Sequence, residues 1–257
     1  MNNYIILKEL NSGTFGTVVK AQHKYTKNIV AIKIEPNTQN TLRYESSIYN
    51  YLNAIPNIPH LKSYFVDENN HYLVQELLDY NLKFYKNDIS LLTPFITSTN
   101  IIRALINILR SIHIKGIVHR DIKPENICFK NNQIYLIDFG LAKQIIHNNT
   151  HIEIKTGKSL VGTPNYVSLN VASGIEPSRR DDLESLLYVL LFLELDDEEF
   201  QKYDIFDIIS KKNIDIITET FKDLPTKNIA KQYVIYCRNL NFNEIPDYNY
   251  LLNILQV

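Results

Sequence analysis

The sequence contains few cysteines, no tryptophan and no long apolar run. The two cysteines, Cys128 and Cys237, are far apart and predict neither a disulfide framework nor a cysteine metal site. Such scarcity indicates a reducing compartment. The most apolar run, residues 183–195, is shorter than the roughly 20 residues of a membrane span and contains Glu184 and Glu194. It predicts a helix buried inside the protein, with no membrane contact.

Net charge is also nearly absent. The 27 basic and 28 acidic side chains leave a formal charge of −1, so we predict no direct nucleic-acid binding. The N-terminus lacks the basic and then apolar pattern of a signal peptide. Hydrophobic residues make up 45% of the 257 residues, enough for a sizeable core. We expect a monomer that stays inside the cell, in the cytoplasm or the nucleus.

Apolar periodicity predicts an α+β organisation. Short alternating runs predict strands at residues 4–10, 17–23, 29–34, 61–66 and 72–76. Helical spacing predicts one helix among them, at residues 41–51, and further helices at residues 101–112 and 182–195. Two short strands, at residues 127–129 and 134–137, are expected to form a hairpin with Asn131–Asn132 as its turn. Residues 143–158 are expected to form an exposed loop. Less regular helical sequence follows residue 195.

A glycine-containing hairpin is expected between the first two strands, with the sequence NSGTFGTV at residues 11–18. Gly13 and Gly16 would let the backbone fold closely over phosphate groups and point amide hydrogens at them. Asn11 stands where such loops usually have a further glycine, and asparagine tolerates positive φ best among the other residues. Most Gly-Thr pairs are simple turns, so this loop alone is weak evidence for a phosphate-binding site.

A lysine on a strand and a glutamate on a helix form the second feature. Lys33 follows an apolar strand run, and Glu45 lies on the apolar stripe of the helix predicted at residues 41–51. Because an unpaired buried charge is costly, the two side chains would form an ion pair. The simpler alternative is an exposed lysine and an unrelated glutamate.

The segment HRDIKPEN at residues 119–126 is the most specific feature. Asp121 is a candidate base for a hydroxyl proton. Lys123 can neutralise charge that develops on a transferred phosphoryl group. Asn126 offers a neutral oxygen to magnesium, a hard cation that binds oxygen ligands. So many spaced polar positions rarely match by chance.

The segment DFG at residues 138–140 follows a predicted strand, and Asp138 is a second candidate magnesium ligand. The four features in this order resemble the eukaryotic-type protein kinase superfamily. The resemblance implies a bilobal fold: an N-lobe with a small antiparallel β-sheet and one helix (1–76), a hinge (77–81) and a mainly helical, shortened C-lobe (82–257). It also implies ATP and Mg²⁺ as cofactors, with Lys33 on the α- and β-phosphates and Phe139 packed beneath Asp138.

Two further segments, GTPNYVSLN at residues 162–170 and GIEPSRRDDLES at residues 174–185, resemble the casein kinase I family. The shorter runs YES (44–46), ELL (76–78) and LIDFGLAK (136–143) are similar to that family as well. The resemblance covers residues 4–195. It implies transfer of the γ-phosphoryl group of ATP to serine or threonine hydroxyls of protein substrates, without prior phosphorylation of the activation loop.

The resemblance also implies an adenine site. Backbone groups of Glu76 and Leu78 would bind the base, and Gln75 would be the gatekeeper beside it. Three side chains would enclose the ring, namely those of Val18, Ala31 and Cys128.

The same resemblance assigns Thr163 to positioning Asp121 and Lys123, and Asp182 to anchoring the backbone of the catalytic loop. Two positions depart from the family. Relatives have an arginine of an anion site where Asn165 stands. They also have an acidic ribose ligand near Phe84, whose role would pass to Asn81.

Two alternatives to an active protein kinase remain at this stage. A nucleotide-binding pseudokinase or scaffold would be expected to have lost Lys33, Asp121, Asn126 or Asp138, and all four are present. Small-molecule phosphotransferases of similar fold lack the long segment between Asp138 and Thr163. Lys123 disfavours tyrosine specificity.

Overall fold

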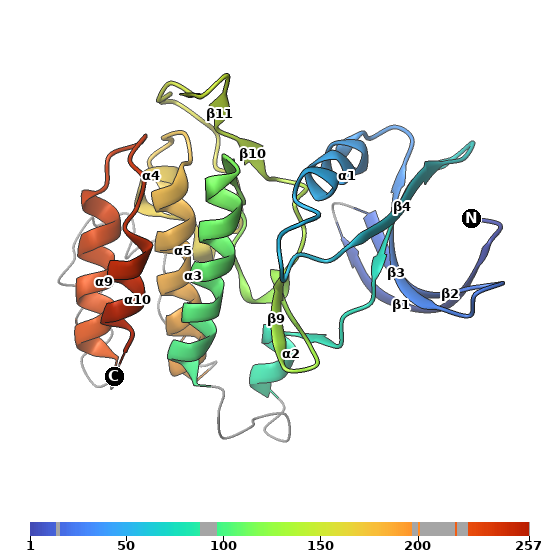
Figure 1. Cartoon of the computed structure of the whole chain (residues 1–257), viewed down its shortest axis with the longest axis horizontal. Coiled ribbons are helices and arrows are strands. Elements are labelled where there is room, and N and C mark those ends of the chain that lie inside the picture. Colours follow the sequence, from blue (N-terminus) through green and yellow to red (C-terminus); the bar gives the residue numbers. More distant parts are fainter. Residues whose placement is uncertain (14–15, 88–96, 197–199, 201–218, 220–225, 257) are drawn as a thin grey trace. The chain divides into compact units, whose positions relative to one another are not determined.

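The structure is a computed structural model that describes residues 1–13, 16–87, 97–196, 200, 219 and 226–256. By their internal contacts the residues divide into two compact units. The first comprises Met1–Tyr80 and Cys128–Gly140, and the second comprises Asn81–Ile127 and Leu141–Val257. Figure 1 labels the elements of both units.

A five-stranded antiparallel sheet in the order β1-β2-β3-β5-β4 makes up much of the first unit (Figure 1). The strands are β1 (Tyr4–Gly13), β2 (Gly16–His23), β3 (Ile29–Pro36), β4 (Leu61–Val66) and β5 (Asn70–Glu76). All five predicted strands are confirmed, and β4 has the predicted bounds. One sheet face carries a buried core of alternate residues, formed by Val19, Ala21, Val30, Ile32, Tyr72 and Val74.

The helix α1 (Thr41–Tyr51) packs against β3, β4 and β5 and also has the predicted bounds. Its buried stripe contains Leu42, Ile48 and Tyr49, together with Glu45. The carboxylate of Glu35 on β3 accepts hydrogen bonds from the Leu42 N–H and the Thr41 hydroxyl. These bonds satisfy donors that the start of a helix leaves free.

A second small sheet, in the order β6-β8-β9, contains β6 (Tyr80–Asn81), β8 (Ile127–Lys130) and β9 (Gln133–Leu136). The predicted Asn131–Asn132 turn joins β8 to β9, and both asparagines have positive φ, as a two-residue hairpin requires. Lys130 Nζ lies 2.6 Å from Glu76 Oε2, and the Leu136 N–H donates to the Asn57 carbonyl. These contacts explain why Cys128–Gly140 groups with the first unit.

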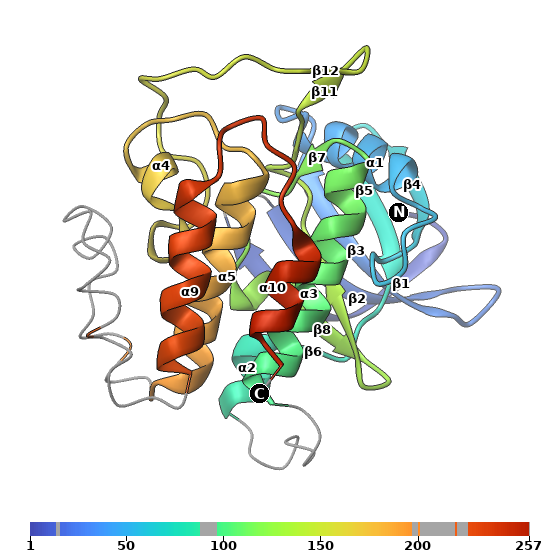
Figure 2. The same ribbon diagram turned by 60° about the vertical axis from the view of Figure 1, so that its left-hand side comes forward.

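Helices dominate the second unit, and Figures 1 and 2 both show α3, α5, α9 and α10 side by side. The helices are α2 (Leu82–Asn87), α3 (Ser98–Ile114), α4 (Leu169–Ala172), α5 (Arg179–Glu194), α9 (Lys227–Asn239) and α10 (Tyr248–Ile254). This unit also contains two 3₁₀ turns, Pro124–Asn126 and Pro164–Tyr166, and several short strands. The predicted α+β class is confirmed.

The ends of α3 and α5 have local causes. Beyond the end of α3, Gly116 adopts φ +73°, and a Cβ there would lie 2.9 Å from the Ile146 side chain. Helix α5 begins before the predicted residue 182 because the Asp181 carboxylate accepts the Ser178 N–H at 2.7 Å. The side chains from Leu183 to Phe192 are buried, as predicted for this apolar run. Within the described residues, no helix combines the length and the apolar character that crossing a membrane requires.

The segment from residue 143 to 158 is more ordered than the predicted exposed loop. Strand β10 (Lys143–Gln144) pairs with β7 (Ile117–Val118), and β11 (Ile146–His147) pairs with β12 (Thr150–His151). Ile145 between them is fully buried, and its N–H donates to the Gly116 carbonyl at 2.7 Å. Two-residue strands are too short to show alternation, which is why the pattern missed them.

Candidate active site

In the first unit, Lys33 lies between two carboxylates. Its Nζ is 2.9 Å from Glu45 Oε2 and 2.9 Å from Asp138 Oδ1. The predicted ion pair with Glu45 is therefore present, and Asp138 is a second partner that the sequence did not indicate. Glu45 is only 1% exposed, so it depends on this pairing.

Local backbone geometry brings Asp138 to Lys33. Asp138 has φ +65°, and its N–H donates to the Tyr49 hydroxyl at 3.0 Å. Phe139 is fully buried and packs edge-on against the Tyr49 ring, with 5.2 Å between centroids. A Cβ at Gly140 would lie 3.3 Å from Asp138 Oδ1 and 3.5 Å from Glu45 Oε2. Glycine at this position therefore keeps room for the carboxylate pair.

Burial and charge shift the pKa values of this cluster. Burial would lower the pKa of Lys33, but Glu45 and Asp138 hold it above its usual value. Burial raises the pKa of Glu45 to about 7; Lys33 opposes this shift and the charge of Asp138 adds to it. Two carboxylates thus share one ammonium group.

Replacing Glu45 with Gln should make thermal stability less dependent on pH. A carboxyl whose pKa rises on folding stabilises the protein fully below its unfolded value, and that contribution is lost as the pH rises through about 7. The melting temperature of Glu45→Gln relative to wild type should therefore rise by a few degrees between pH 5 and pH 8, measured by calorimetry without nucleotide. The exposed Glu68→Gln is the control for removal of a carboxylate from this unit. A pH-independent difference in melting temperature between Glu45→Gln and wild type would contradict the assignment.

The sheet face opposite the core carries the residues expected around adenine. In the antiparallel register Val18 lies opposite Lys33, and Ala31 lies opposite Gln75. Because paired residues and alternate residues share a face, these four side chains lie together. The predicted residues of β2, β3 and β5 thus form an apolar surface that ends in an ammonium group. The Gln75 side chain on this face is also a hydrogen-bonding neighbour of the Tyr49 hydroxyl.

Glu76 and Leu78, whose backbone groups were expected to bind adenine, lie at the end of β5 and just beyond it. The Glu76 side chain is engaged by Lys130 and by the His60 N–H, and Leu78 lies past the end of the strand. Burial raises the pKa of the Cys128 thiol to about 12, so this side chain acts as an apolar group. Asn81 Oδ1 accepts the Phe84 N–H at 2.9 Å at the start of α2. That bond occupies the amide oxygen that was expected to substitute for an acidic ribose ligand.

The β1–β2 hairpin contains both predicted glycines, which are paired with each other. Gly16 has φ +99°, and a Cβ there would lie 2.0 Å from the Ile34 carbonyl oxygen, so only glycine fits. Asn11 lies in β1 opposite Val18, next to a register shift, and is not among the residues with positive φ. The ability of asparagine to adopt positive φ, which was expected to matter at this position, is therefore not needed here. Thr14 and Phe15 lie outside the described residues.

In the second unit, Asp121 is the centre of a buried hydrogen-bond network. Its Oδ1 accepts the Thr163 hydroxyl at 2.8 Å, and its Oδ2 lies 2.7 Å from Lys123 Nζ. Lys123 Nζ also donates to Thr163 Oγ1 at 2.9 Å. Thr163 thus contacts both residues that it was expected to position.

Asn126 completes this network. Its Nδ2 donates to the Asp121 carbonyl at 2.9 Å and to Asp121 Oδ2 at 3.1 Å. Because Nδ2 makes both of these hydrogen bonds, the amide oxygen Oδ1 is the atom that could bind a hard cation as a ligand. The carboxylate of Asp138 in the first unit is a donor of the same kind. The donor chemistry of both predicted ligands therefore fits Mg²⁺.

Asp182 at the start of α5 holds the backbone before Asp121. Its Oδ2 accepts the His119 N–H at 2.7 Å, and its Oδ1 accepts the Arg120 N–H at 2.8 Å. Arg120 itself has a positive φ of +69°, so the backbone turns sharply just before Asp121. Gly162 packs against the same turn, where a Cβ would lie 2.5 Å from the Arg120 carbonyl oxygen. The expected anchoring contact of Asp182 is present.

Sequence reasoning missed His113 and Tyr248, which extend this network from Asp182 into α3 and α10. The one available signal was a histidine on the apolar stripe of the helix predicted at residues 101–112 and ended by Gly116. Such a residue is more often structural than functional, and its partners are far away in the sequence.

The first unit contains a lysine between two carboxylates and a hairpin that requires glycine, and the second contains a buried aspartate paired with a lysine. A family model, the protein kinase domain, matches residues 4–240. The chain belongs to the protein kinase domain family. The predicted superfamily and its α+β kinase fold are thereby confirmed, and the family uses ATP as the phosphoryl donor.

Proposed function

We propose that this chain is an ATP- and magnesium-dependent serine/threonine kinase of the casein kinase I type, acting on protein substrates. The observation that carries the proposal is the network of Asp121, Lys123 and Thr163. A carboxylate with an adjacent ammonium group can receive a hydroxyl proton and stabilise the charge of the transferred phosphoryl group.

In the proposed reaction, the substrate hydroxyl gives its proton to Asp121 as its oxygen bonds to the γ-phosphorus. The bond from that phosphorus to the β,γ-bridging oxygen breaks, and ADP leaves. Lys123 neutralises charge on the γ-phosphoryl group, and Lys33 binds the α- and β-phosphates. Asp138 and Asn126 would hold Mg²⁺, which supplies positive charge to the phosphate oxygens when bound.

The backbone of Glu76 and Leu78 would bind adenine, with Val18, Ala31 and Cys128 enclosing the ring and Gln75 at its edge. The strand register supports this, because it brings Val18, Ala31 and Gln75 to one face of the sheet. Gly13 and Gly16 would cover the phosphates.

Contacts between the two most family-like segments support the casein kinase I assignment. Ser168 in the first segment donates to Asp181 in the second at 2.6 Å, and Asn170 Nδ2 donates to the same carboxylate at 3.2 Å. Glu184 of the second segment accepts the Leu169 N–H and binds Arg238 of α9. The unusual residues of one segment thus have their partners in the other.

A radiolabelled-ATP assay on a peptide library tests the function, with Asp138→Asn as the inactive control. Three peptides that differ only in the acceptor, serine, threonine or tyrosine, test its specificity. Phosphorylation of serine and threonine but not tyrosine supports the proposal. Equal labelling by wild type and Asp138→Asn would contradict catalysis by this site and favour a nucleotide-binding scaffold.

We expect the enzyme to be active without phosphorylation of its activation loop. The candidate sites Thr156 and Ser159 lie in a segment that backbone bonds already fasten: the Lys158 N–H donates to the Gly174 carbonyl, and the Glu176 N–H donates to the Lys155 carbonyl. No added phosphate is needed to hold these residues. Phosphatase-treated enzyme should keep its activity within about twofold, and the Thr156→Ala, Ser159→Ala double variant should match it. Loss of most activity after phosphatase treatment would contradict this expectation.

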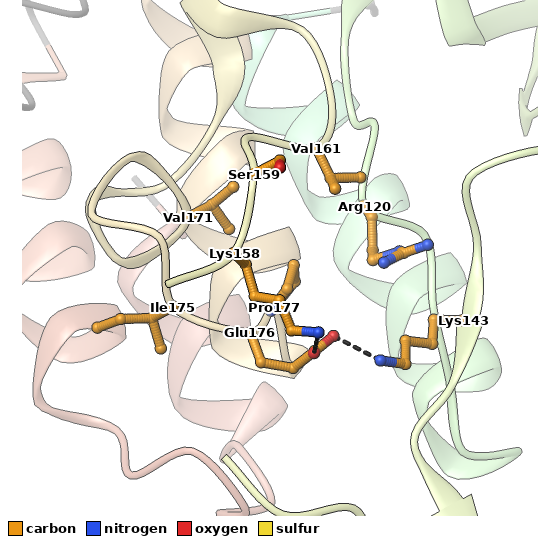
Figure 3. Close-up of a pocket in the computed structure, with 9 residues that line it drawn as sticks. All are labelled: Arg120, Lys143, Lys158, Ser159, Val161, Val171, Ile175, Glu176 and Pro177. Carbon is orange, nitrogen blue, oxygen red and sulfur yellow. Dashed lines mark hydrogen bonds and ion pairs between the residues drawn. The ribbon is translucent and has the colours of Figure 1, made fainter. Parts of the chain in front are cut away.

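Substrate choice should depend little on an upstream phosphate or acid. Asn165 is exposed and carries no charge where relatives have arginine. Three basic residues, Arg120, Lys143 and Lys158, line a cavity of about 240 Å³ (Figure 3), and each already has a partner. Lys143 lies 2.6 Å and Lys158 3.7 Å from the buried carboxylate of Glu176, and Arg120 Nε donates to the Leu141 carbonyl. A substrate phosphate would have to compete with Glu176 for both lysines.

Loss of one charge-assisted contact typically costs about 1.5–3 kcal/mol, or roughly tenfold or more in selectivity. We therefore expect similar kcat/KM values for a peptide with phosphoserine three residues before the target and for the same peptide with alanine there. A ratio of about a hundred would contradict this prediction. Glu176→Gln releases both lysines and should raise the ratio, which identifies Glu176 as the competitor.

A further inference from the structure

Helix α10 places a tyrosine against the histidine that supports Asp182. The Tyr248 hydroxyl lies 2.8 Å from His113 Nδ1, and His113 Nε2 lies 3.0 Å from Asp182 Oδ2. All three residues are at most 5% exposed. Helix α10 lies beyond residue 240, where the match to the kinase family model ends.

These three residues end at the catalytic loop. The Asp182 oxygen that faces His113 also accepts the His119 N–H, and its other oxygen accepts the Arg120 N–H. Asp121 follows these two residues directly. A rotation of the Asp182 carboxylate would therefore shift the backbone that positions Asp121.

The proton positions within the network follow from charge. Burial would raise the pKa of Asp182, but the hydrogen bond from His113 and the neighbouring amides hold it below its usual value. An ionised carboxylate favours a donor opposite it, which agrees with a proton on Nε2 of His113. Burial lowers the pKa of His113, so the ring is neutral and Nδ1 accepts the Tyr248 O–H. Tyr248 remains a donor because burial raises its own pKa.

The surroundings favour this arrangement. Arg179 of α5 and the imidazole of His119 both disfavour a second proton on His113. Helix α10 is itself fastened to α3: Arg103 Nη1 donates to the Leu252 carbonyl at 2.6 Å, and Arg110 Nη1 donates to Asn249 Oδ1 at 3.1 Å. Helix α10 packs against α3, and Figure 2 shows the two helices side by side.

We propose that Tyr248 is a positioning residue for the catalytic loop. Its hydroxyl fixes the Nε2–H tautomer of His113, which orients the Asp182 carboxylate toward the amides of His119 and Arg120. Without that hydroxyl, His113 can carry its proton on Nδ1 and turn a lone pair toward Asp182, which repels the carboxylate. The inference rests on the proposed function insofar as Asp121 is the catalytic base.

Tyr248→Phe removes the hydroxyl and keeps the ring, and Tyr250→Phe on the same helix is the matched control. Tyr248→Phe should lower kcat on the order of three- to tenfold with KM for ATP unchanged, because the base and not the nucleotide site is displaced. Hydrogen exchange of the His119 and Arg120 amides should accelerate in Tyr248→Phe and stay at the wild-type rate in Tyr250→Phe.

Nitrogen-15 NMR of wild-type His113 gives a readout that needs neither activity nor a variant. A proton on Nε2 supports the proposal, and a proton on Nδ1 overturns it even where Tyr248→Phe does not fold. A folded Tyr248→Phe with wild-type kcat and wild-type exchange at both amides also overturns it. If wild type transfers no phosphate, the proposed function fails, and the exchange comparison still decides the role of Tyr248.

Discussion

Replacing Asp121 with Asn is expected to lower kcat by about two to four orders of magnitude, the usual contribution of a general base. The affinity for ATP should stay nearly unchanged, because in the proposed mechanism Asp121 acts on the attacking hydroxyl and not on the nucleotide. Asparagine can still accept the Thr163 hydroxyl and remain near Lys123, so the network should keep its shape. The measurements are kcat with a serine peptide and the Kd of ATP by calorimetry.

Glu125→Gln is a suitable control, because Glu125 lies in the same segment but pairs with the exposed Lys83. It should keep kcat within about twofold, as expected for an exposed ion pair. Wild-type activity in Asp121→Asn would show that the proposed mechanism is wrong.

Replacing Asp138 with Asn should abolish the effect of magnesium on nucleotide binding. The variant removes a carboxylate that is 2.9 Å from Lys33 and is the only charged candidate among the two predicted magnesium ligands. We expect kcat/KM to fall at least about a hundredfold, since charge stabilisation by the metal is lost. Wild-type protein should bind ATP more tightly with Mg²⁺ than without it, and Asp138→Asn should show no such difference.

The exposed acid Glu68 provides the matched control in the same unit, and Glu68→Gln should retain both the activity and the magnesium effect. A magnesium titration of activity separates the two roles of Asp138. An unchanged titration in Asp138→Asn would exclude it as a metal ligand. Loss of folding, detected by calorimetry, would instead assign it to the ion pair with Lys33.

Elements with a strong local pattern were predictable almost to the residue. The bounds of α1 and β4 match the prediction because apolar periodicity over six or more residues reports which face is buried. The Asn131–Asn132 turn was equally predictable, since its two positive φ angles favour asparagine. By contrast, β10, β11 and β12 have two residues each, and their pairing depends on strands or turns that the pattern does not show.

The candidate site was predictable as a set of residues and partly as a set of contacts. The pairing of Lys33 with Glu45 followed from two charges on inward-facing positions. Thr163 and Asp182 were identified by resemblance, and both make the contacts that it implied. The occupied oxygen of Asn81 could not be anticipated, because helix capping is decided by the geometry of the first turn.

The sequence alone determined the α+β class, the kinase family and the candidate residues of the site, because periodicity and short motifs act over neighbouring positions. Only the tertiary structure decided that Asp138 is the second partner of Lys33, that Glu176 occupies two lysines, and that Tyr248 reaches Asp182 through His113. A buried charge takes whichever partner packing brings within hydrogen-bonding distance, and that choice is made between residues tens of positions apart.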